Sequence, residues 1–424
     1  MSAAIRFVLD GLREMLRGGP AYWRWLGVLG VLIAIGLWAY IGQIDRGLVV
    51  TGMSDQVSWG FYISNFAFLV GIAAAAVLLV IPAYLFHRVD VKSVVLLGEG
   101  LAVAAVICAM LFVTVDLGRP ERVWHMFPVI GRFNWPMSLL AWDVVVLSGY
   151  LALNLALPLY VHFCHWRGQE PVFRLYFPVV VVAMFWAISI HTVTAFLFSA
   201  NAGRPFWHTA LLGPRFIASA FVSGPALIIL VLQVIRRVTD YPVKQSVIDT
   251  LALIMAVSLQ ISLFFVVAEL FTDFYNETSH AGSMRYLFFG LGGLGGLRGW
   301  IWTALALNVA AVVILSIHKL RTHMTTLNIA CVLAFVGIWI EKGMGLVVPG
   351  FIPTPLGEVF EYTPTMRELA VALGIWAIGA LVFTLLAKAS IAIELGRVGA
   401  RRATQESADA MPGATRSAAS TAAS

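Results

Sequence analysis

Ten apolar runs dominate this sequence, and each is long enough to cross a lipid bilayer as a helix. About 20 apolar residues in helical form span the roughly 30 Å of hydrocarbon in a membrane. A soluble domain of 424 residues does not sustain a composition that is 60% hydrophobic and 12% charged. We therefore predict an all-α integral membrane protein with ten transmembrane helices. The predicted spans are 25–43, 58–86, 93–115, 137–161, 174–198, 217–235, 248–271, 300–320, 324–343 and 368–391.

The two ends of the chain differ from this membrane domain, which we place at residues 25–392. Residues 1–24 are basic and contain no small-residue cleavage site, so we predict a cytoplasmic segment before a first helix that is retained as an anchor. Residues 393–424 are rich in Ala, Ser and Thr. Because they offer too little apolar surface to fold, we predict a disordered cytoplasmic tail.

The charge of the chain indicates its orientation. Most of the 28 Lys and Arg residues fall at the N-terminus and in the loops that share its side of the membrane. The longer loops, such as 116–136 and 346–367, lie on the other side. Cytoplasmic loops carry the excess of basic residues, so both termini are predicted to be cytoplasmic in a bacterial inner membrane. Read in this way, the net charge of +6 calls for no nucleic-acid partner.

Polar and ionisable side chains interrupt several of the apolar runs. A charge inside hydrocarbon is costly, so such residues usually line a substrate or proton pathway and do not face lipid. Most of them lie toward the extracytoplasmic side. They are Trp59, Tyr62, Asn65, Asp143, His191, Glu269 and Glu341, with Asp116 and Arg119 just outside a span. This pattern predicts a membrane protein with a polar pocket.

Cysteine and histidine usage argues against a resident redox group. Cys108, Cys164 and Cys331 are isolated, so we expect no iron–sulfur cluster held by this chain. A membrane haem with two histidine ligands needs both inside the bundle, and only His191 is clearly intramembrane. We predict no metal site and no cofactor bound covalently or through a metal.

A glycine-rich stretch matches a nucleotide-binding pattern by its letters alone. Gly290-Leu-Gly292-Gly293-Leu-Gly295 has the spacing G-x-G-x-x-G. That fingerprint binds dinucleotides only where it follows a strand and opens a helix. Here it follows an apolar loop between two membrane helices, so we predict a tight turn or a re-entrant stretch.

A short motif occurs twice, at an interval of 85 residues. Gly118-Arg119-Pro120 and Gly203-Arg204-Pro205 each follow a predicted helix, and each precedes a Trp-His pair. Chance similarity of short loops and duplication of a helix-loop-helix unit both explain the pattern. Duplicated units build sites at repeat interfaces in membrane proteins.

The run of motifs from about residue 20 to 395 resembles the NrfD/PsrC family, the integral membrane subunits of polysulfide-reductase-type complexes. The first matches are Asp55-Gln-Val-Ser-Trp59-Gly60-Phe-Tyr62-Ile-Ser-Asn65 and Asp116-Leu-Gly118-Arg119-Pro120 with Trp124-His125-Met126. Further matches are Arg204-Pro205-Phe-Trp207-His208, Arg215-Phe216, Glu341-Lys342-Gly343-Met-Gly345, Pro349-Gly-Phe351 and Glu361-Tyr362-Thr-Pro364 with Glu368. Within the family, the ten-helix form most resembles the DsrP group of sulfite-reduction-associated DsrMKJOP complexes.

The resemblance implies a fold and a function. The fold is two four-helix bundles with one extra helix at each end. The function is exchange of electrons between menaquinone or ubiquinone and a ferredoxin-like iron–sulfur subunit on the outer face, which is DsrO in the DsrP setting. The other partners implied are a multihaem cytochrome c, a membrane cytochrome b and a cytoplasmic iron–sulfur subunit. Some relatives are proposed to move protons without an assigned quinone site.

The residues themselves agree with a quinone site. A quinone head needs hydrogen-bond partners for two carbonyl oxygens, an apolar slot, and a proton donor or acceptor. Trp59, Tyr62 and Asn65 recur every three residues and are predicted to share one broad helix face. Together with Asp116 and Arg119, they are our predicted quinone-binding residues, although Trp59 and Tyr62 also suit the aromatic belt at a membrane interface. We expect Asp116 and Arg119 to pair at a helix end, in a turn fixed by Pro120.

Four residues are predicted to transfer protons. His191 lies about 10 Å inside the outer end of its helix, at a rise of about 1.5 Å per residue, and its imidazole suits proton exchange. Asp143 and Glu269 have similar depths. Glu99 lies in the inner half, where Gln260 is expected to join it in a path toward the cytoplasm. Hydrogen bonding between helices is the alternative role for these residues.

Two other function classes fit parts of the pattern. A secondary transporter also has repeats, buried charges and glycine-rich breaks, but its polar groups gather at the membrane midplane. A structural anchor or proton-conducting subunit without a quinone site would use the buried charges for packing or proton movement.

Overall fold

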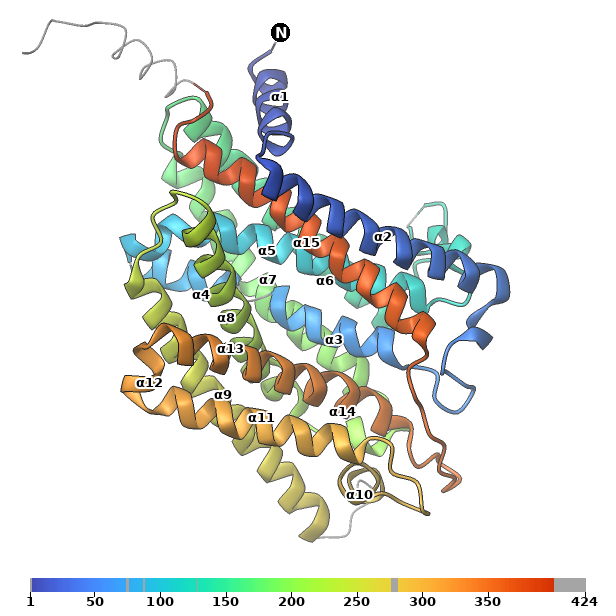
Figure 1. The fold of residues 1–424 in the computed structure, drawn as a ribbon. Helices are drawn as coiled ribbons and strands as arrows, with labels where there is room; N and C mark the ends of the chain where they lie inside the picture. The colour runs from blue at the N-terminus through green and yellow to red at the C-terminus, as the bar shows by residue number, and fades with distance from the viewer. Residues whose placement is uncertain (1, 74–75, 87, 128, 276–280, 400–424) are drawn as a thin grey trace, which may run out of the picture.

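The computed structural model describes the chain except for residues 1, 74–75, 87, 128, 276–280 and 400–424 (Figure 1). It contains ten helices that are long and apolar enough to cross a membrane, and every predicted span falls on one of them. The described residues include no strand, only an isolated bridge between Leu291 and Leu294. The prediction of an all-α membrane protein is therefore confirmed. Residues 400–424 of the predicted tail lie outside the described residues.

Most of the spanning helices extend a few residues beyond the predicted boundaries, because polar residues such as Asp45 and Arg46 also adopt the helical conformation, whereas the second is shorter at both ends than the predicted 58–86. The spanning helices are α2 (Pro20–Arg46), the second span Phe61–Tyr84, α5 (Val89–Asp116), α6 (Leu139–Trp166), α7 (Phe173–Ser199), α8 (Leu212–Val238), α9 (Gln245–Tyr275), α11 (Arg298–Ser316), α13 (Met324–Trp339) and α15 (Met366–Glu394). The second span consists of α3 (Phe61–Ala73), α4 (Val77–Val80) and a π-helical end, η3 (Ile81–Leu85). The ninth continues from α13 through η6 (Ile340–Met344), α14 (Gly345–Val347) and η7 (Val348–Phe351).

The helices pack as two four-helix bundles with two additional helices. The second span, α5, α6 and α7 form the first bundle, and α8, α9, α11 and α13 form the second. The additional helices α2 and α15 lie along each other and cover one side of the first bundle (Figure 1). Two glycines permit this crossing, because a Cβ added to Gly36 would lie 2.6 Å from the Cα of Gly374. The bundle arrangement expected from the family resemblance is confirmed.

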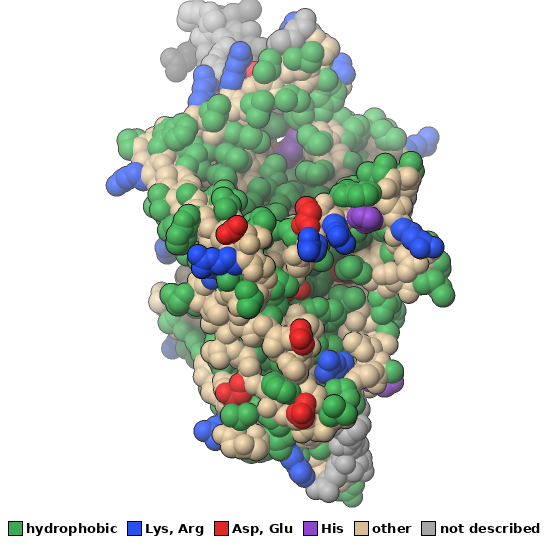
Figure 2. Space-filling model, turned by 90° about the vertical axis from the view of Figure 1, so that its right-hand side faces the viewer, with side chains coloured by type: hydrophobic (Ala, Val, Ile, Leu, Met, Phe, Trp, Pro, Cys, Tyr) green, Lys and Arg blue, Asp and Glu red, His purple; other side chains and the backbone are tan. Residues whose placement is uncertain are grey.

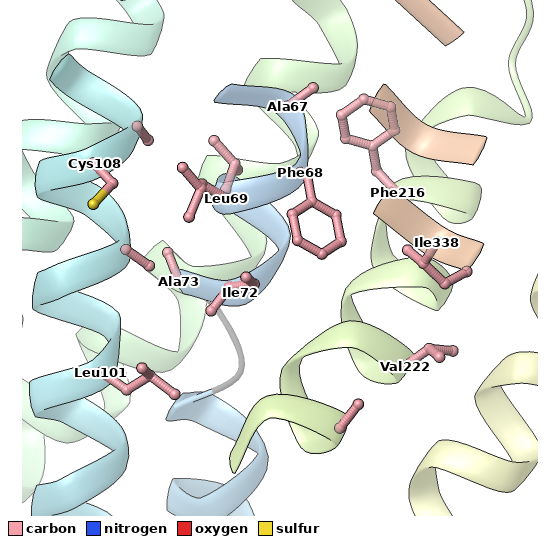
Figure 3. Close-up of a cluster of buried hydrophobic side chains, with 14 of the residues drawn as sticks. Ala67, Phe68, Leu69, Ile72, Ala73, Leu101, Cys108, Phe216, Val222 and Ile338 are labelled. Carbon is pink, nitrogen blue, oxygen red and sulfur yellow. The ribbon is translucent and has the colours of Figure 1, made fainter. Parts of the chain in front are cut away.

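The two bundles meet through α3, which is buried along its whole length. Phe68 of α3 points toward Phe216 of α8 and Ile338 of α13, whereas Leu69 faces the side of α5 and Cys108 (Figure 3). The turn η6 also reaches α3, and a Cβ added to Gly343 would lie 3.1 Å from the carbonyl oxygen of Ser64. Residues of η6 therefore lie at the contact between the bundles.

The longer connections lie at the end of the molecule where the α3, α8 and α15 helices begin. They contain η1 (Leu48–Val50), η4 (Pro120–Met126), η5 (Pro205–Trp207) and α10 (Ala281–Phe289). Figure 2 looks onto this end, which we call the outer face, and shows acidic and basic side chains gathered near its middle. The opposite end carries α1 (Ala3–Met15) and α12 (His318–Thr322).

The Gly-Arg-Pro motif begins a turn in the same way at both of its positions. Arg119 has φ −135° and ψ 69°, and Arg204 has φ −125° and ψ 83°. In both copies the proline then begins a 3-10 helix, as suits a residue without a backbone N–H. The repeated sequence therefore encodes a repeated local structure at the outer face.

The glycine-rich stretch forms a tight turn, as predicted. Gly290, Gly292 and Gly293 have φ of +85°, +60° and +83°, a conformation that side chains other than glycine rarely adopt. Glu361 accepts hydrogen bonds from the backbone N–H groups of Gly295 and Gly296, at 2.7 and 2.8 Å. The turn is thereby fixed to the segment that precedes α15.

Candidate functional site

A group of polar side chains lies at the outer end of the first bundle. Tyr62 donates a hydrogen bond to Oε1 of Gln43 on α2 at 2.6 Å, and Gln43 donates to the carbonyl oxygen of Val115 on α5 at 2.7 Å. Asp116 and Arg367 are both near enough to act electrostatically on the Tyr62 hydroxyl. We call Gln43, Tyr62, Asp116 and Arg367 the outer cluster.

Two atoms of the outer cluster are buried without a hydrogen-bond partner among the described residues. One is Oδ1 of Asp116, an acceptor, and the other is Nη1 of Arg367, a donor. Most buried polar groups in proteins are paired, so an unpaired acceptor and an unpaired donor near one hydroxyl indicate a place for a polar ligand. Arg367 was not among the predicted site residues, because the predicted span began at residue 368, whereas α15 begins at Met366.

The neighbouring acidic residue, Glu368, is fully occupied by structural contacts. Its Oε1 accepts from the Tyr362 hydroxyl at 2.5 Å, and its Oε2 accepts from the backbone N–H groups of Gly52 and Thr365, both at 2.8 Å. Thr365 and Glu368 form a capping box at the start of α15. Burial and the charge of Glu368 hold the pKa of Tyr362 far above its usual value, so Tyr362 remains a hydrogen-bond donor.

The predicted pair of Asp116 and Arg119 is wrong. Pro120 begins η4 directly after Arg119, and the exposed Arg119 side chain pairs with Glu121 at 3.5 Å. Asp116 remains at the end of α5, within the outer cluster. Of the five predicted quinone-binding residues, the structure therefore brings Tyr62 and Asp116 together.

Trp59 and Asn65 contact other parts of the molecule. Trp59 precedes α3, so helical spacing does not apply to it, and its ring stacks on Trp207 with centroids 5.7 Å apart. Oδ1 of Asn65 accepts from the indole N–H groups of Trp339 at 3.1 Å and Trp376 at 3.0 Å. Its Nδ2 donates to the carbonyl oxygen of Phe61 at 2.8 Å. The Asn65 amide thus links α3 to α13 and α15.

A buried ion network occupies the second bundle. Arg215 on α8 pairs with Glu269 on α9 and donates to Oε1 of Glu341 in η6 at 3.0 Å. Nδ2 of Asn308 on α11 donates to the other oxygen of Glu341 at 3.0 Å. We call Arg215, Glu269, Glu341 and Asn308 the arginine network. It satisfies two carboxylates with one guanidinium, as buried charges require.

The sequence analysis missed the roles of Arg215 and Asn308 in this network. The predicted span began at residue 217, which left Arg215 in a loop, whereas α8 begins at Leu212. The sequence did contain a signal for the role of Arg215. An arginine beside an apolar run can pair with glutamates that lie inside two other spans.

A pocket of about 310 Å³ borders the arginine network at the outer end of the second bundle. Arg215 and Glu269 form part of its lining, together with apolar side chains from η5, α10 and α14. The lining residues are Phe206, His208, Thr209, Ala210, Leu211, Leu212, Arg215, Glu269, Thr272, Asp273, Met284 and Leu346. The network therefore adjoins a space that a water chain or a small polar group can enter.

Lys342 and His191 lie deeper, where the two bundles meet. Nζ of Lys342 lies 4.2 Å from the ring centre of Phe216 and donates to the Phe216 carbonyl oxygen at 3.4 Å. His191 on α7 places Nδ1 3.1 Å from the carbonyl oxygen of Ala187, and its Nε2 has no partner among the described residues. Lys342 acts electrostatically on this imidazole. The preceding helix, α6, contributes Asp143, which accepts a hydrogen bond from Thr194 of α7 at 2.8 Å.

Glu99 lies apart, buried in α5 toward the inner end. Its Oε2 has no hydrogen-bond partner within the described part of the chain, and Tyr84 and Tyr150 both interact with it electrostatically. The predicted partner Gln260 is instead exposed, and it donates to Ser316 at 3.5 Å. The expected path from Glu99 through Gln260 is therefore wrong, because Gln260 faces away from the first bundle.

Ten apolar helices with polar groups buried between them define a multi-pass integral membrane protein. Residues 49–337 match the family described as polysulphide reductase, NrfD. The chain therefore belongs to the NrfD family. Among the described residues, no group of three or more His, Cys, Asp or Glu side chains is placed to hold a metal ion.

Several known proteins are similar along most of their length. A putative membrane component of a dimethyl sulfoxide reductase from Halobacterium salinarum is 29% identical over 421 residues, which cover 90% of this chain and 92% of the relative. An Hdr-like menaquinol oxidoreductase integral membrane subunit of Archaeoglobus fulgidus is 24% identical, covering 84% and 90%. The integral membrane subunit of a menaquinone reductase from Nitratidesulfovibrio vulgaris is 23% identical, covering 85% and 89%.

Proposed function

We propose that this protein is the quinone-interacting membrane subunit of a reductase complex. It exchanges electrons between the membrane quinone pool and an iron–sulfur partner on the outer face. Two relatives named for menaquinol or menaquinone chemistry support this assignment, since each matches more than four-fifths of the chain. The DsrP group remains the most specific resemblance that the motifs offer.

One observation carries the proposal, namely the unpaired acceptor and donor of the outer cluster. A quinone offers two carbonyl oxygens, and a quinol offers two hydroxyl groups. Nη1 of Arg367 supplies a donor for a carbonyl oxygen, and Oδ1 of Asp116 supplies an acceptor for a hydroxyl. The Tyr62 hydroxyl, held by Gln43, lies near both groups. Trp59 and Asn65 then position the surrounding helices without touching the head group.

The redox step balances without a cofactor in this subunit. A quinol that binds at the outer cluster loses two electrons and two protons and leaves as the quinone. The electrons pass to a ferredoxin-like iron–sulfur subunit, which must dock against the outer face because electron transfer needs short distances. Asp116 accepts one proton, since its Oδ1 is unpaired and its carboxylate acts electrostatically on the Tyr62 hydroxyl, and the second proton is released to water at the outer face.

Proton movement along the contact between the two bundles is the other half of the proposal. His191, Lys342 and the arginine network form a series of ionisable groups that ends at the outer pocket. Asp143 lies beside this series, and Glu99 would serve the inner half. A subunit that only conducts protons would use this series and leave the outer cluster without a role.

The remaining partners follow the DsrP resemblance. We propose a multihaem cytochrome c, a membrane cytochrome b and a cytoplasmic iron–sulfur subunit in the same complex. The substrate is menaquinone or ubiquinone. The protein lies in the inner membrane with both termini in the cytoplasm.

Equilibrium binding tests the quinone site directly. The full chain is reconstituted in lipid nanodiscs, and a short-chain menaquinone analogue is titrated while tryptophan fluorescence is recorded. Asp116→Asn and Arg367→Gln are expected to weaken binding, whereas Glu121→Gln, an exposed carboxylate at the same face, leaves it unchanged. Equal binding by all four proteins would place the quinone elsewhere.

A further inference from the structure

Helix α1 carries an apolar stripe that nothing in this chain covers within the described residues. Ile5, Val8 and Leu12, followed by Leu16 at the C-cap, recur at intervals of three and four residues, so they share one side of the helix. Their exposed fractions are 51%, 53%, 49% and 65%. Four large apolar side chains in a row are therefore presented away from the protein.

The opposite side of α1 is held against the membrane domain. The ring of Phe7 meets Phe163 edge to face with centroids 5.5 Å apart, and it also contacts Trp166. Oδ2 of Asp10 accepts a hydrogen bond from the indole N–H of Trp166 at 3.1 Å. These contacts fix the rotation of α1 about its own axis, so the direction of the apolar stripe is set by the fold.

The contacts of α1 also fix its depth. Phe163 and Trp166 belong to the last turn of α6, and Ala392 and Ile393, which pack in one cluster with Phe7 and Trp166, belong to the last turn of α15. Both helices are membrane spans that end at this level. Because α1 packs against these ends and runs at an angle to α2 (Figure 1), it would lie at the boundary between hydrocarbon and water in a bilayer that the spans cross.

The charged residues of α1 are sorted between its sides. The side chains of Arg13 and Arg17 are 71% and 66% exposed, whereas their acidic partners Asp10 and Glu14 are 30% and 15% exposed. Arg6 is exposed as well. The outward charge of α1 is therefore positive, and it flanks the apolar stripe. This is the arrangement of a helix that lies in a membrane interface.

We propose that α1 binds the phospholipid leaflet at the end of the membrane where α2 begins. Its apolar stripe enters the boundary of the acyl chains, and its arginines bind the phosphates of anionic head groups. The lipid-facing surface of α2 continues this stripe, since Trp23, Val28 and Val31 are about half exposed along the helix that follows. Because the neighbouring apolar surface of α2 faces lipid, lipid is also the partner that we assign to the apolar stripe of α1.

Site-directed spin labelling of the full chain in nanodiscs tests this inference. A nitroxide is attached at Val8→Cys in the apolar stripe and, as the matched control, at Arg13→Cys on the charged side of the same helix. The native cysteines Cys108, Cys164 and Cys331 are buried, so labelling is directed to the introduced thiol. Collisions with oxygen, which concentrates in lipid, and with a water-soluble nickel chelate are measured for both sites. The nanodiscs contain phosphatidylcholine with or without phosphatidylglycerol.

The inference predicts a higher ratio of oxygen to nickel collisions at Val8 than at Arg13. It also predicts that phosphatidylglycerol increases this difference, and that replacing Arg6 and Arg17 with Gln removes the increase. Equal nickel access at both sites would show that the stripe faces water. Protection of Val8 from both reagents would show that protein covers it. Either result would overturn the proposal.

Discussion

The guanidinium of Arg215 donates to Oε1 of Glu341 at 3.0 Å, and this contact joins the first helix of the second bundle to the π-helical turn in its last. The same guanidinium also pairs with Glu269 on α9. One positive charge thereby balances two carboxylates from different helices. The second bundle is therefore expected to depend on Arg215 more than on any exposed charge.

Replacing Arg215 with Met should destabilise the protein strongly. The change leaves two buried carboxylates without their cation, and breaking a buried pair costs roughly 3–5 kcal/mol. Thermal unfolding in nanodiscs measures the loss, with Arg298→Met at the exposed start of α11 as the control. Adding Glu269→Gln and Glu341→Gln to the variant should restore part of the stability. An unchanged unfolding temperature for Arg215→Met would contradict the ion network.

Asn65→Leu should loosen the contact of α3 with α13 and α15. The substitution removes the acceptor of two indole N–H groups, and each buried donor left unpaired costs about 1–3 kcal/mol. Unfolding in nanodiscs should occur at a lower temperature. Trp376→Phe removes one of the two indole N–H donors that Asn65→Leu leaves unpaired. The variant that carries both changes should therefore be less destabilised than the sum of the two single changes. Strict additivity would show that the bond to Trp376 contributes nothing.

The close packing of α2 against α15 should be lost when Gly36 or Gly374 is replaced by a residue with a side chain. A Cβ on Gly36 would lie 2.6 Å from the Cα of Gly374, so Gly36→Ala forces the helices apart. Gly30 on the same helix has no atom within 4 Å of an added Cβ, and Gly30→Ala is the matched control. Cross-linking between cysteines placed on α2 and α15 should fall for the first variant alone. Equal cross-linking in both would argue against close packing there.

Reporter fusions should find both ends of the chain in the cytoplasm. The basic residues gather on the side where α1 lies, and basic loops stay inside. Fusions after Arg88 and Arg237 should therefore report the cytoplasm. Fusions in the loops 116–138 and 352–365 should report the opposite side. The reverse pattern would invert the orientation on which the docking of the iron–sulfur partner depends.

The helices could be predicted from the sequence because each span is a long apolar run. Long apolar runs have few alternative structures in a bilayer, so the ten spans and the bundle arrangement expected from the family agree with the fold. The ends of the spans were predicted less accurately, and the predicted start at residue 217 left Arg215 outside its helix. The turn at Gly290 was also predictable, since positive φ favours glycine.

The candidate site was only partly predictable. Spacing along one helix suggested a common face for Trp59, Tyr62 and Asn65, yet the partners of these residues come from distant helices. Tyr62 meets Gln43, whereas Asn65 meets Trp339 and Trp376. The partner of Arg119 depends on the turn that Pro120 begins. Tertiary packing decides which partner each of these side chains contacts, and that packing cannot be read from a single sequence.

Electron transfer within the complete complex tests the central claim most directly. The purified complex is mixed with a quinol analogue, and reduction of the iron–sulfur partner is followed by its visible absorbance. Loss of a hydrogen bond to a charged group costs about 1.5–3 kcal/mol, and about 1.4 kcal/mol is a factor of ten. Asp116→Asn and Arg367→Gln should each slow the quinol-dependent rate by about tenfold or more, whereas Glu121→Gln should not. Assembled complexes of both variants that reduce the partner at the normal rate would contradict a quinone site at the outer cluster.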